Sequence, residues 1–577
     1  MKVFCVLWVL CGISLSAFAL DREAFTFTKY DLQIQLEPEQ SRLGARGKIT
    51  LRNDSAQPQK IAVLQISSSL GWRSIQADGK TLQFVSQPFA SDIDHTGALS
   101  EAIITLPAQV KPEDSIELEV AYEGTIPLDS TRLTQIGVPE VIARHASWDQ
   151  ITPSFTAVRG VGYVAWYPIS TESADFTEGN SMFQVANRWK RREASSEMNI
   201  SACSSDDQTP PDAVLMGDRS PGVRGGSGGG SDHHPQQKFL CVLHRFEPAG
   251  IDAPTFAFAK FKKQTAGGSP LVTVHSLDNH DSGATTYLIA ASPSAKFVTE
   301  WFGSPTTPIA IADLADPHAA PFESGMLLLT SMEVVDPKLA QINLTHELVH
   351  SAFLSPRPWI YEGLAHFAEA VYREKQDGRQ AALMLLGVHR AAFVDPEKAV
   401  AGAPQKNPGE PLSATFDEIY YRSKAAYVWW MLRDMIGEAS LKQAIHNYRP
   451  ADDKDPKYME QLLTAASKRD LGWFFDDWVY HDRGLPDLHV QSVHPWKNEN
   501  GTQIITVTFE NLGSAGAEVP YTVRFDDGEI TRRIEIRAKS TATTRIELPG
   551  APLEVIINDG SVPETEMGNN AFRIVER

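Results

Sequence analysis

Residues 338–369 read KLAQINLTHELVHSAFLSPRPWIYEGLAHFAE. Apolar residues recur at helical spacing on both sides of Pro356 and Pro358, which predicts helices over 338–353 and 362–375 with a turn at the prolines. In the first helix His346 and His350 are four residues apart, so their imidazoles share a face and can reach one zinc ion. Glu347 can place its carboxylate near a water molecule on that ion.

A third zinc ligand is expected on a following segment, because a catalytic zinc keeps three protein ligands and one open position. Glu362, in the second helical stretch, is predicted to supply it. His366, four residues later, is the alternative ligand, or else a packed residue that supports the site. Glu369 lies near the helical face of Glu362 and is a candidate hydrogen-bond acceptor for a ligand imidazole, with a surface carboxylate as the other interpretation.

The whole chain of 577 residues is long enough for about three or four domains. Hydrophobic residues make up 42% and charged residues 22%, which is typical of soluble globular proteins. The net charge of −19 disfavours a nucleic-acid partner or an anionic membrane surface, since both need a concentrated positive surface.

The N-terminus predicts export. Lys2 precedes an apolar run that is too short to span a bilayer, and Ala17-Phe18-Ala19 is typical of a signal-peptide cleavage site, so residues 1–19 are expected to be removed. The mature chain is therefore expected to be secreted or periplasmic, without a transmembrane segment. It keeps two cysteines, Cys203 and Cys241, which can form one disulfide but cannot make a structural thiolate zinc site.

Hydrophobic patterning divides the mature chain into three parts. Short alternating runs predict an all-β domain over 20–268, interrupted over 191–237 by a Gly- and Ser-rich stretch that is interpreted as a flexible insertion. Longer periodic segments predict a mainly helical domain over 269–483. Alternation returns over 484–577 and predicts a C-terminal β-sandwich, so the fold class is multidomain α+β.

The two halves of the zinc motif resemble those of the gluzincin metallopeptidases, and among them the aminopeptidase N family. That signature pairs His-Glu-x-x-His with Trp-x-x-Glu-Gly-x-Ala, which here are residues 346–350 and 359–365. The segment 421–433, the segment Gly484-Leu485-Pro486 and the N-terminal β region are also similar to the family. The resemblance implies a thermolysin-like catalytic domain with one zinc ion, and it favours Glu362 over His366 as third ligand.

The chain departs from the family pattern at three places. Eleven residues separate His350 from Glu362, fewer than in aminopeptidase N. The family's Gly-x-Met-Glu-Asn strand, whose glutamate binds the substrate's amino group, is best matched by Gly325 and Met326 as substrate-binding residues, with no glutamate after them. Glu323 is the substitute, with an ordinary solvated glutamate as the alternative.

The third departure concerns the tyrosine that stabilises the oxyanion in the family. Tyr421 is the candidate, although it stands three residues before Lys424 instead of two. Tyr420 is the second choice, Arg422 could stabilise the charge instead, and a structural role for the tyrosine is the other interpretation.

These residues together predict an exported zinc metallopeptidase that acts on peptides or proteins. A zinc-activated water would attack the peptide bond with Glu347 as general base, and Tyr421 would bind the oxyanion. An aminopeptidase is the leading hypothesis. The alternatives are an endopeptidase of the same fold, a binding protein that retains the zinc site, and histidines that are ordinary core residues.

Overall fold

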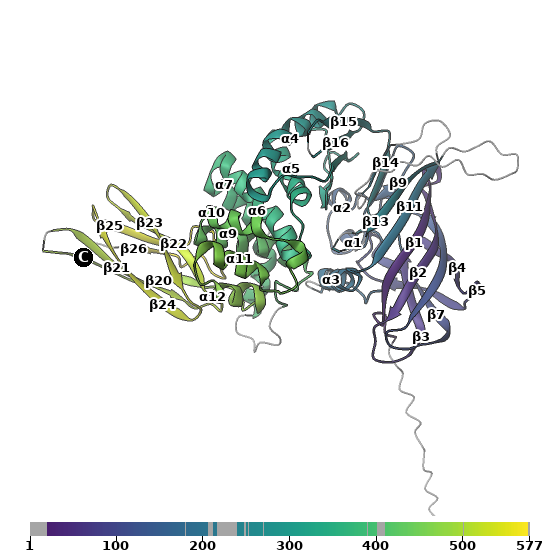
Figure 1. Cartoon of the computed structure of the whole chain (residues 1–577), viewed down its shortest axis with the longest axis horizontal. Helices are drawn as coiled ribbons and strands as arrows, with labels where there is room; N and C mark the ends of the chain where they lie inside the picture. Colours follow the sequence, from purple (N-terminus) through teal and green to yellow (C-terminus); the bar gives the residue numbers. More distant parts are fainter. Residues whose placement is uncertain are drawn as a thin grey trace, which may run out of the picture.

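The computed structural model describes residues 20–178, 181–205, 212–215, 239–246, 250–251, 253–268, 270–388, 390–400, 410–499 and 501–574. Three parts follow one another along its longest axis: β-rich at the N-terminus, helical in the middle and β-rich at the C-terminus (Figure 1). This is the multidomain α+β architecture expected from the sequence. The predicted signal segment, residues 1–19, lies outside the described residues.

The N-terminal part is built on long antiparallel strands with one buried face. In β1 (Phe25–Glu37), the alternate residues Tyr30, Leu32, Ile34 and Leu36 are buried, as their spacing predicts. Within the described residues, the strands of this part form three sheets. The largest has the order β13 (Phe239–Phe246), β11 (Glu197–Ser205), β1 (Phe25–Glu37), β2 (Arg42–Asn53), β8 (Ser115–Thr125), β4 (Leu70–Ala77) and β5 (Lys80–Thr81). A second sheet has the order β3 (Gln59–Ser67), β7 (Ala98–Val110) and β6 (Phe84–Ala90), and a third has the order β12 (Asp212–Leu215), β14 (Phe256–Ala259), β10 (Phe155–Val158) and β9 (Gln150–Ile151). The α-helices that the described residues add to it are α1 (Thr131–Thr134), α2 (Glu140–Ala146) and α3 (Ser181–Glu193).

The interpretation of residues 191–237 as a flexible insertion is wrong at its start. Helix α3 continues to Glu193, and β11 pairs in parallel with β1 inside the large sheet. Met198, Ile200 and Ala202 of β11 are buried, but the strand is otherwise polar, which concealed it among the Ser- and Asp-rich residues that follow. Cys203 is disulfide-bonded, and the strand register places it opposite Cys241.

The middle part packs helices against a five-stranded sheet. The strand order is β15 (Lys262–Ala266), β16 (Val272–Ser276), β17 (Ile309–Asp313), β19 (Leu327–Thr330) and β18 (Phe322–Ser324), so the sheet begins a few residues before 269. The helices are α4 (Asp281–Phe302), α5 (Pro337–Ala352), α6 (Pro358–Asp377), α7 (Arg379–Gly387), α8 (Arg390–Val400), α9 (Ala425–Ile436), α10 (Glu438–Asn447), α11 (Tyr458–Ser467) and α12 (Gly472–Phe475). Two π-helical segments, Ile419–Lys424 and Asp476–Tyr480, precede α9 and follow α12.

The C-terminal part is the predicted β-sandwich. One sheet holds β20 (Leu488–Lys497), β21 (Gln503–Asn511) and β24 (Ser540–Leu548); the other holds β23 (Gly528–Ile536), β22 (Ala517–Phe525), β25 (Pro552–Ile557) and β26 (Ala571–Arg573). Its apolar core is continuous with the core of the helical part. Trp478 is fully buried at the junction and donates to the Gly516 carbonyl at 2.8 Å. The sandwich is therefore fixed to the helices by packing.

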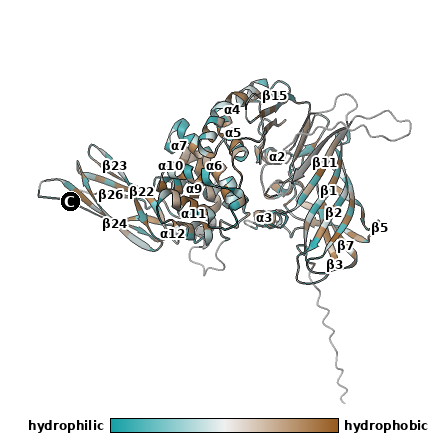
Figure 2. Ribbon diagram, viewed as in Figure 1, coloured by the Kyte–Doolittle hydropathy of each residue, from teal (hydrophilic) through white to brown (hydrophobic). Residues whose placement is uncertain are grey.

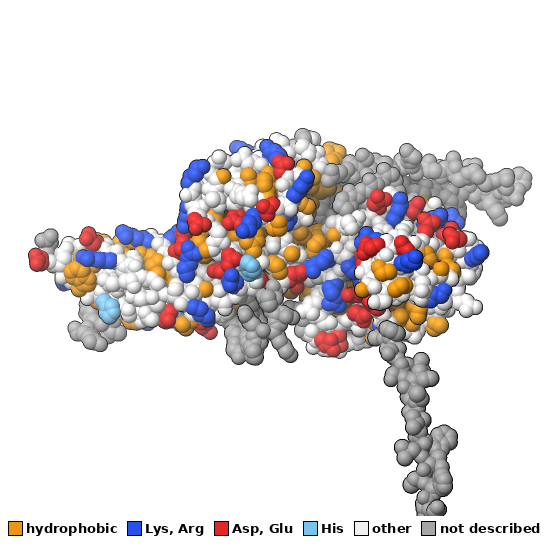
Figure 3. Space-filling view, turned by 60° about the horizontal axis from the view of Figure 1, so that its bottom comes forward, with side chains coloured by type: hydrophobic (Ala, Val, Ile, Leu, Met, Phe, Trp, Pro, Cys, Tyr) orange, Lys and Arg blue, Asp and Glu red, His pale blue; other side chains and the backbone are white. Residues whose placement is uncertain are grey.

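Hydropathy and charge are distributed as in a globular protein. Apolar residues concentrate among the packed helices around α9 (Figure 2). Acidic and basic side chains are interspersed over the face shown in Figure 3. Among the described residues, no helix combines the length and the apolar character needed to cross a bilayer.

Helix α6 approaches α9 closely at Gly363. A Cβ atom at Gly363 would lie 2.6 Å from the Ala425 Cβ and 3.1 Å from the Trp429 ring. One turn earlier, Trp359 stacks on Trp429 with ring centroids 5.1 Å apart, and Trp429 Nε1 donates to the Trp359 carbonyl. The Trp-x-x-Glu-Gly pattern thus has a packing reason: Trp359 and Gly363 fix α6 on α9, and Glu362 lies between them.

Replacing Gly363 by Ala is expected to destabilise the protein by about 1–3 kcal/mol, since the added methyl group overpacks two buried helices. The matched control is Gly387→Ala in α7, where the nearest atom to an added Cβ is 3.9 Å away. Urea denaturation of both variants tests this, and equal midpoints would contradict the close contact.

Candidate functional site

Helix α5 brings two histidines and a glutamate together in the interior. The helix begins at Pro337, where the Asp336 side chain accepts hydrogen bonds from the first free backbone N–H groups. His346 and His350 are each 1% exposed, and their Nε2 atoms lie 3.0 Å apart. Two imidazoles that converge through Nε2 in the interior are typical of a metal site.

Helix α6 adds Glu362 to this pair. Helix α5 ends at Ala352 and α6 begins at Pro358, and Glu362 lies one turn into α6, 4% exposed. Its Oε1 is 3.4 Å from His350 Nε2, and its Oε2 is 3.8 Å from His346 Nε2. These separations agree with the spacing of about 3.4 Å between tetrahedral ligands at zinc bond lengths. The residues present therefore fit one zinc ion.

Electrostatics at the three ligands depends on opposite charges at close range. Burial lowers the pKa of a histidine, but the carboxylates of Glu323, Glu369 and Glu362 raise the pKa of His346 to about 10. Burial lowers the pKa of His350 to about 3. Burial would raise the pKa of Glu362, but the positive charge of Arg422 and the neighbouring histidines together outweigh it and hold the pKa of this carboxyl below its usual range. Glu362 therefore stays ionised, which is the form in which a carboxylate binds a cation.

Glu369 and His366 lie behind His346. Glu369 Oε1 is 3.2 Å from His346 Nδ1, and Glu369 Oε2 is 2.8 Å from His366 Nδ1. The geometry therefore groups Glu362 with both motif histidines, whereas His366 groups with His346 and Glu369. Glu369 is placed where it can orient the imidazole of His346 through its outer nitrogen.

Glu347 is fully buried, and neither of its carboxylate oxygens has a hydrogen-bond partner among the described residues. Burial raises the pKa of this carboxyl well above its ordinary value. An unpaired carboxylate in the interior is costly and needs an explanation beyond packing.

Tyr421 and Arg422 enter the site from the π-helical segment. Both line a cavity of about 220 Å³ together with Glu362, and Tyr421 is 3% exposed. Tyr420, the second choice from the sequence, lines a separate pocket near Arg188. A π-helical turn accommodates one additional residue, which is the physical counterpart of the longer spacing between Tyr421 and Lys424.

Strand β18 presents Glu323 to the ligand group. Its Oε2 lies 3.8 Å from His346 Nε2, and its side chain is 18% exposed. Gly325 and Met326 form the two-residue turn to β19, where a φ of +58° at Gly325 suits a glycine. Those two residues line neither of the cavities beside the histidines, whereas Glu323 lines both.

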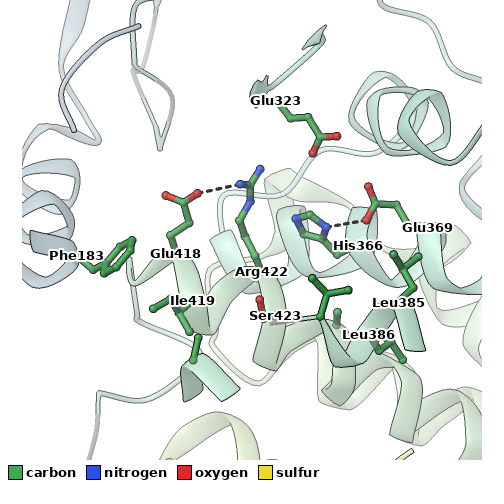
Figure 4. A pocket seen from close by; sticks show the side chains of 13 residues that line it. Phe183, Glu323, His366, Glu369, Leu385, Leu386, Glu418, Ile419, Arg422 and Ser423 are labelled. Atoms are coloured by element: carbon green, nitrogen blue, oxygen red, sulfur yellow. Dashed lines mark hydrogen bonds and ion pairs between the residues drawn. The ribbon is translucent and has the colours of Figure 1, made fainter. Parts of the chain in front are cut away.

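A larger cavity of about 580 Å³ adjoins the ligand group. Figure 4 shows its polar side, where Glu323, Arg422 and the paired His366 and Glu369 lie, and its apolar side at Leu385 and Leu386. The remaining lining residues are Phe183, Val388, Ala392, Glu418, Ile419, Ser423 and Ala426.

Sequence reasoning missed the partners of Arg422. This guanidinium donates to Glu362 and to Glu418, and Glu418 also faces Lys190 of α3. The spacing of four residues between Glu418 and Arg422 is typical of an ion pair on a helix and could have predicted that contact. No sequence pattern predicts that Lys190 or Glu362 contacts this pair.

Comparisons with known proteins were made by sequence and by structure. No family model and no curated protein sequence matches the chain. Among solved structures, aminopeptidase A of Legionella pneumophila, in complex with aspartic acid, is similar with a TM-score of 0.58 and 12% identity. The match covers 94% of this chain and 59% of that protein, so the chain spans about three fifths of its length.

Two structures of M1 zinc metallopeptidases are also similar. One, from Deinococcus radiodurans, is a mutant bound to a Tyr-Ser-Ala substrate, with a TM-score of 0.46 and 15% identity over 81% of this chain and 96% of that one. The other, a mutant of a two-domain M1 zinc metallopeptidase bound to L-arginine, has a TM-score of 0.47 and 16% identity over 77% of this chain and 93% of that one. The chain therefore shares its fold with the Legionella aminopeptidase, which confirms the multidomain architecture expected from the sequence.

Proposed function

We propose that this protein is an exported zinc-dependent peptidase of the aminopeptidase type, which hydrolyses the first peptide bond of a substrate with a free amino group. The observation that carries the proposal is the convergence of His346, His350 and Glu362 beside the unpaired carboxylate of Glu347. The similarity in fold to an aminopeptidase agrees with it.

Glu347 is the proposed general base and acid. A bound zinc ion would supply Lewis acidity, which lowers the pKa of a coordinated water and polarises the scissile carbonyl. The Glu347 carboxylate accepts a proton from the attacking water and donates it to the leaving amine nitrogen. Neither of its oxygens has a hydrogen-bond partner among the described residues, so both are available to a water molecule.

Tyr421 is the proposed hydrogen-bond donor to the oxyanion. Burial raises the pKa of its hydroxyl above the ordinary value, so the group stays protonated at neutral pH and can donate. Arg422, the other candidate from the sequence, is already engaged by Glu362 and Glu418.

Glu323 is the proposed receptor for the substrate's amino group. It is an anion beside the ligand group, and it lines both cavities there. An ammonium group held by this carboxylate would place the first peptide bond near Glu347. Glu323 thereby binds the free N-terminus of the substrate in place of the family's glutamate, which is absent after Met326.

The apolar side of the larger cavity is proposed to receive an uncharged, apolar substrate side chain. Its apolar side lies at Leu385 and Leu386, and the carboxylates of Glu323, Glu369 and Glu418 also line it. Burial of a leucine-sized side chain there is favourable, whereas an acidic side chain meets like charge.

Export is proposed from the N-terminal segment, residues 1–19. The disulfide at Cys203 supports it, because disulfides persist in oxidising compartments outside the cytosol.

Replacing Glu347 by Gln is expected to leave zinc bound and to lower hydrolysis at least about 100-fold, because the amide cannot transfer the proton. His350→Ala is expected to lose the metal, and the exposed His446→Ala serves as control. Elemental analysis and cleavage of amino-acid anilides measure both effects. Full activity of Glu347→Gln would contradict the mechanism. If the protein is instead a binding protein that retains the zinc site, its binding function is expected to be unaffected by Glu347→Gln.

Replacing Glu323 by Gln is expected to lower kcat/KM for free-amine substrates roughly 10–100-fold, the value of a charge-assisted hydrogen bond. The exposed Glu333→Gln is the matched control. The same anilides with a blocked N-terminus are expected to resist the wild-type protein. Equal cleavage of blocked and free substrates would indicate an endopeptidase instead.

Substrate preference gives a separate test of the cavity. A leucine anilide is expected to exceed an aspartate anilide in kcat/KM by about 10-fold or more, since burying a leucine side chain contributes about 2 kcal/mol. A preference for the aspartate substrate would exclude the apolar cavity as the side-chain site.

A further inference from the structure

Charged side chains alternate in sign from helix α3 of the N-terminal part to the metal-ligand group. Lys190 Nζ lies 3.5 Å from Glu418 Oε2. Arg422 Nη1 donates to Glu418 Oε1 at 2.9 Å, and Arg422 Nε donates to Glu362 Oε2 at 3.1 Å. Figure 4 shows the middle of this row, where Arg422 is joined to Glu418. The row connects two parts of the chain that are far apart in sequence.

These ion pairs are more enclosed than ordinary surface pairs. The side chains of Lys190, Arg422 and Glu362 are 16%, 24% and 5% exposed, and that of Glu418 is 35% exposed. Exposed ion pairs contribute little, but pairs at the wall of a buried site are screened less by solvent. Arg422 also uses two different guanidinium nitrogens for two carboxylates, which fixes its orientation.

The two oxygens of Glu362 have different neighbours. Oε1 is 3.4 Å from His350 Nε2, whereas Oε2 accepts the hydrogen bond from Arg422. Because the guanidinium holds one oxygen, rotation of the carboxylate is restricted and the other oxygen keeps its approach to His350. Arg422 thus controls how Glu362 faces the histidines.

The π-helical turn makes this contact compatible with Tyr421. Tyr421 and Arg422 are adjacent in sequence, and both line the cavity that contains Glu362. Glu418 directly precedes the π-helical segment and lies one turn from Arg422. One short segment therefore supplies both the tyrosine and the arginine pair.

We propose that Lys190, Glu418 and Arg422 are positioning residues, which hold Glu362 in its metal-ligating orientation and make the zinc affinity depend on the contact between α3 and the π-helical segment. The inference rests on the proposed zinc site. It extends control of that site to a residue of the N-terminal part, Lys190.

The test is the zinc dissociation constant of folded variants, measured by competition with a chromogenic chelator. Arg422→Met is expected to weaken zinc binding about 10–100-fold, the usual effect of removing a partner of a metal ligand. Glu418→Gln and Lys190→Met are expected to weaken it less, by roughly 3–10-fold, because they act through Arg422. Arg188→Met is the matched control, since Arg188 lies on the same helix and pairs with Glu23.

Two further measurements separate positioning from simple stabilisation. The melting temperature of each metal-free variant reports the structural contribution, and the absorption bands of the cobalt-substituted proteins report ligand geometry. Positioning predicts altered cobalt bands and weaker zinc binding in Arg422→Met. Arg422→Lys keeps the charge but cannot contact both carboxylates through separate guanidinium nitrogens, so its zinc affinity is expected to lie between those of the wild-type protein and Arg422→Met. It replaces Arg422→Met in the test if that variant does not fold.

The inference would be overturned if Arg422→Met had the zinc affinity and cobalt bands of the wild-type protein, and these ion pairs would then have a purely structural role. If Arg422→Met does not fold, the same comparison is made with Arg422→Lys. Equal weakening in Lys190→Met and in the Arg188→Met control would overturn the part assigned to α3. Absence of zinc binding by the wild-type protein would instead overturn the zinc site, and this inference with it.

Discussion

The burial of ionisable side chains between α5 and α6 is the constraint on which the rest of the site depends. His346, Glu347, His350 and Glu362 are each at most 4% exposed. Charges in the interior are costly unless opposite charges or a metal compensate them. The surroundings provide that compensation, with Arg422 on Glu362 and Glu369 on His346. The exception is Glu347, whose unpaired oxygens mark the place where chemistry is proposed.

The packing of α6 fixes this geometry. One face of α6 packs against α9 through the stacked rings of Trp359 and Trp429, and the two helices can approach closely because Gly363 has no side chain. With this face fixed, Glu362 faces α5, where the two histidines converge. Eleven residues between His350 and Glu362 are sufficient for this arrangement, because the prolines make a short turn between the helices. A shortened link therefore leaves the ligand group intact.

Much of the architecture was predictable because it depends on periodicity. The alternation in β1 specifies a buried face locally, and the apolar lengths of α5 and α9 are typical of helices that are buried on more than one side. The strand β11 was missed because a mostly polar strand inside a large sheet owes its place to its neighbours. The one-residue shift at Tyr421 was visible in the sequence, but its accommodation by a π-helical turn depends on hydrogen bonding within the folded helix.

The sequence by itself determined the candidate ligands: helical spacing pairs His346 with His350, and the resemblance to the gluzincin motif favours Glu362 over His366 as the third ligand. It also showed where the chain departs from the family pattern, at Arg422 and Glu323. Only the tertiary structure decided what these charges face: Arg422 lies on Glu362, Lys190 lies on Glu418, and Glu323 lies near His346. The physical reason is that such contacts join segments separated by tens to hundreds of residues, and their geometry follows from packing, which no local pattern records.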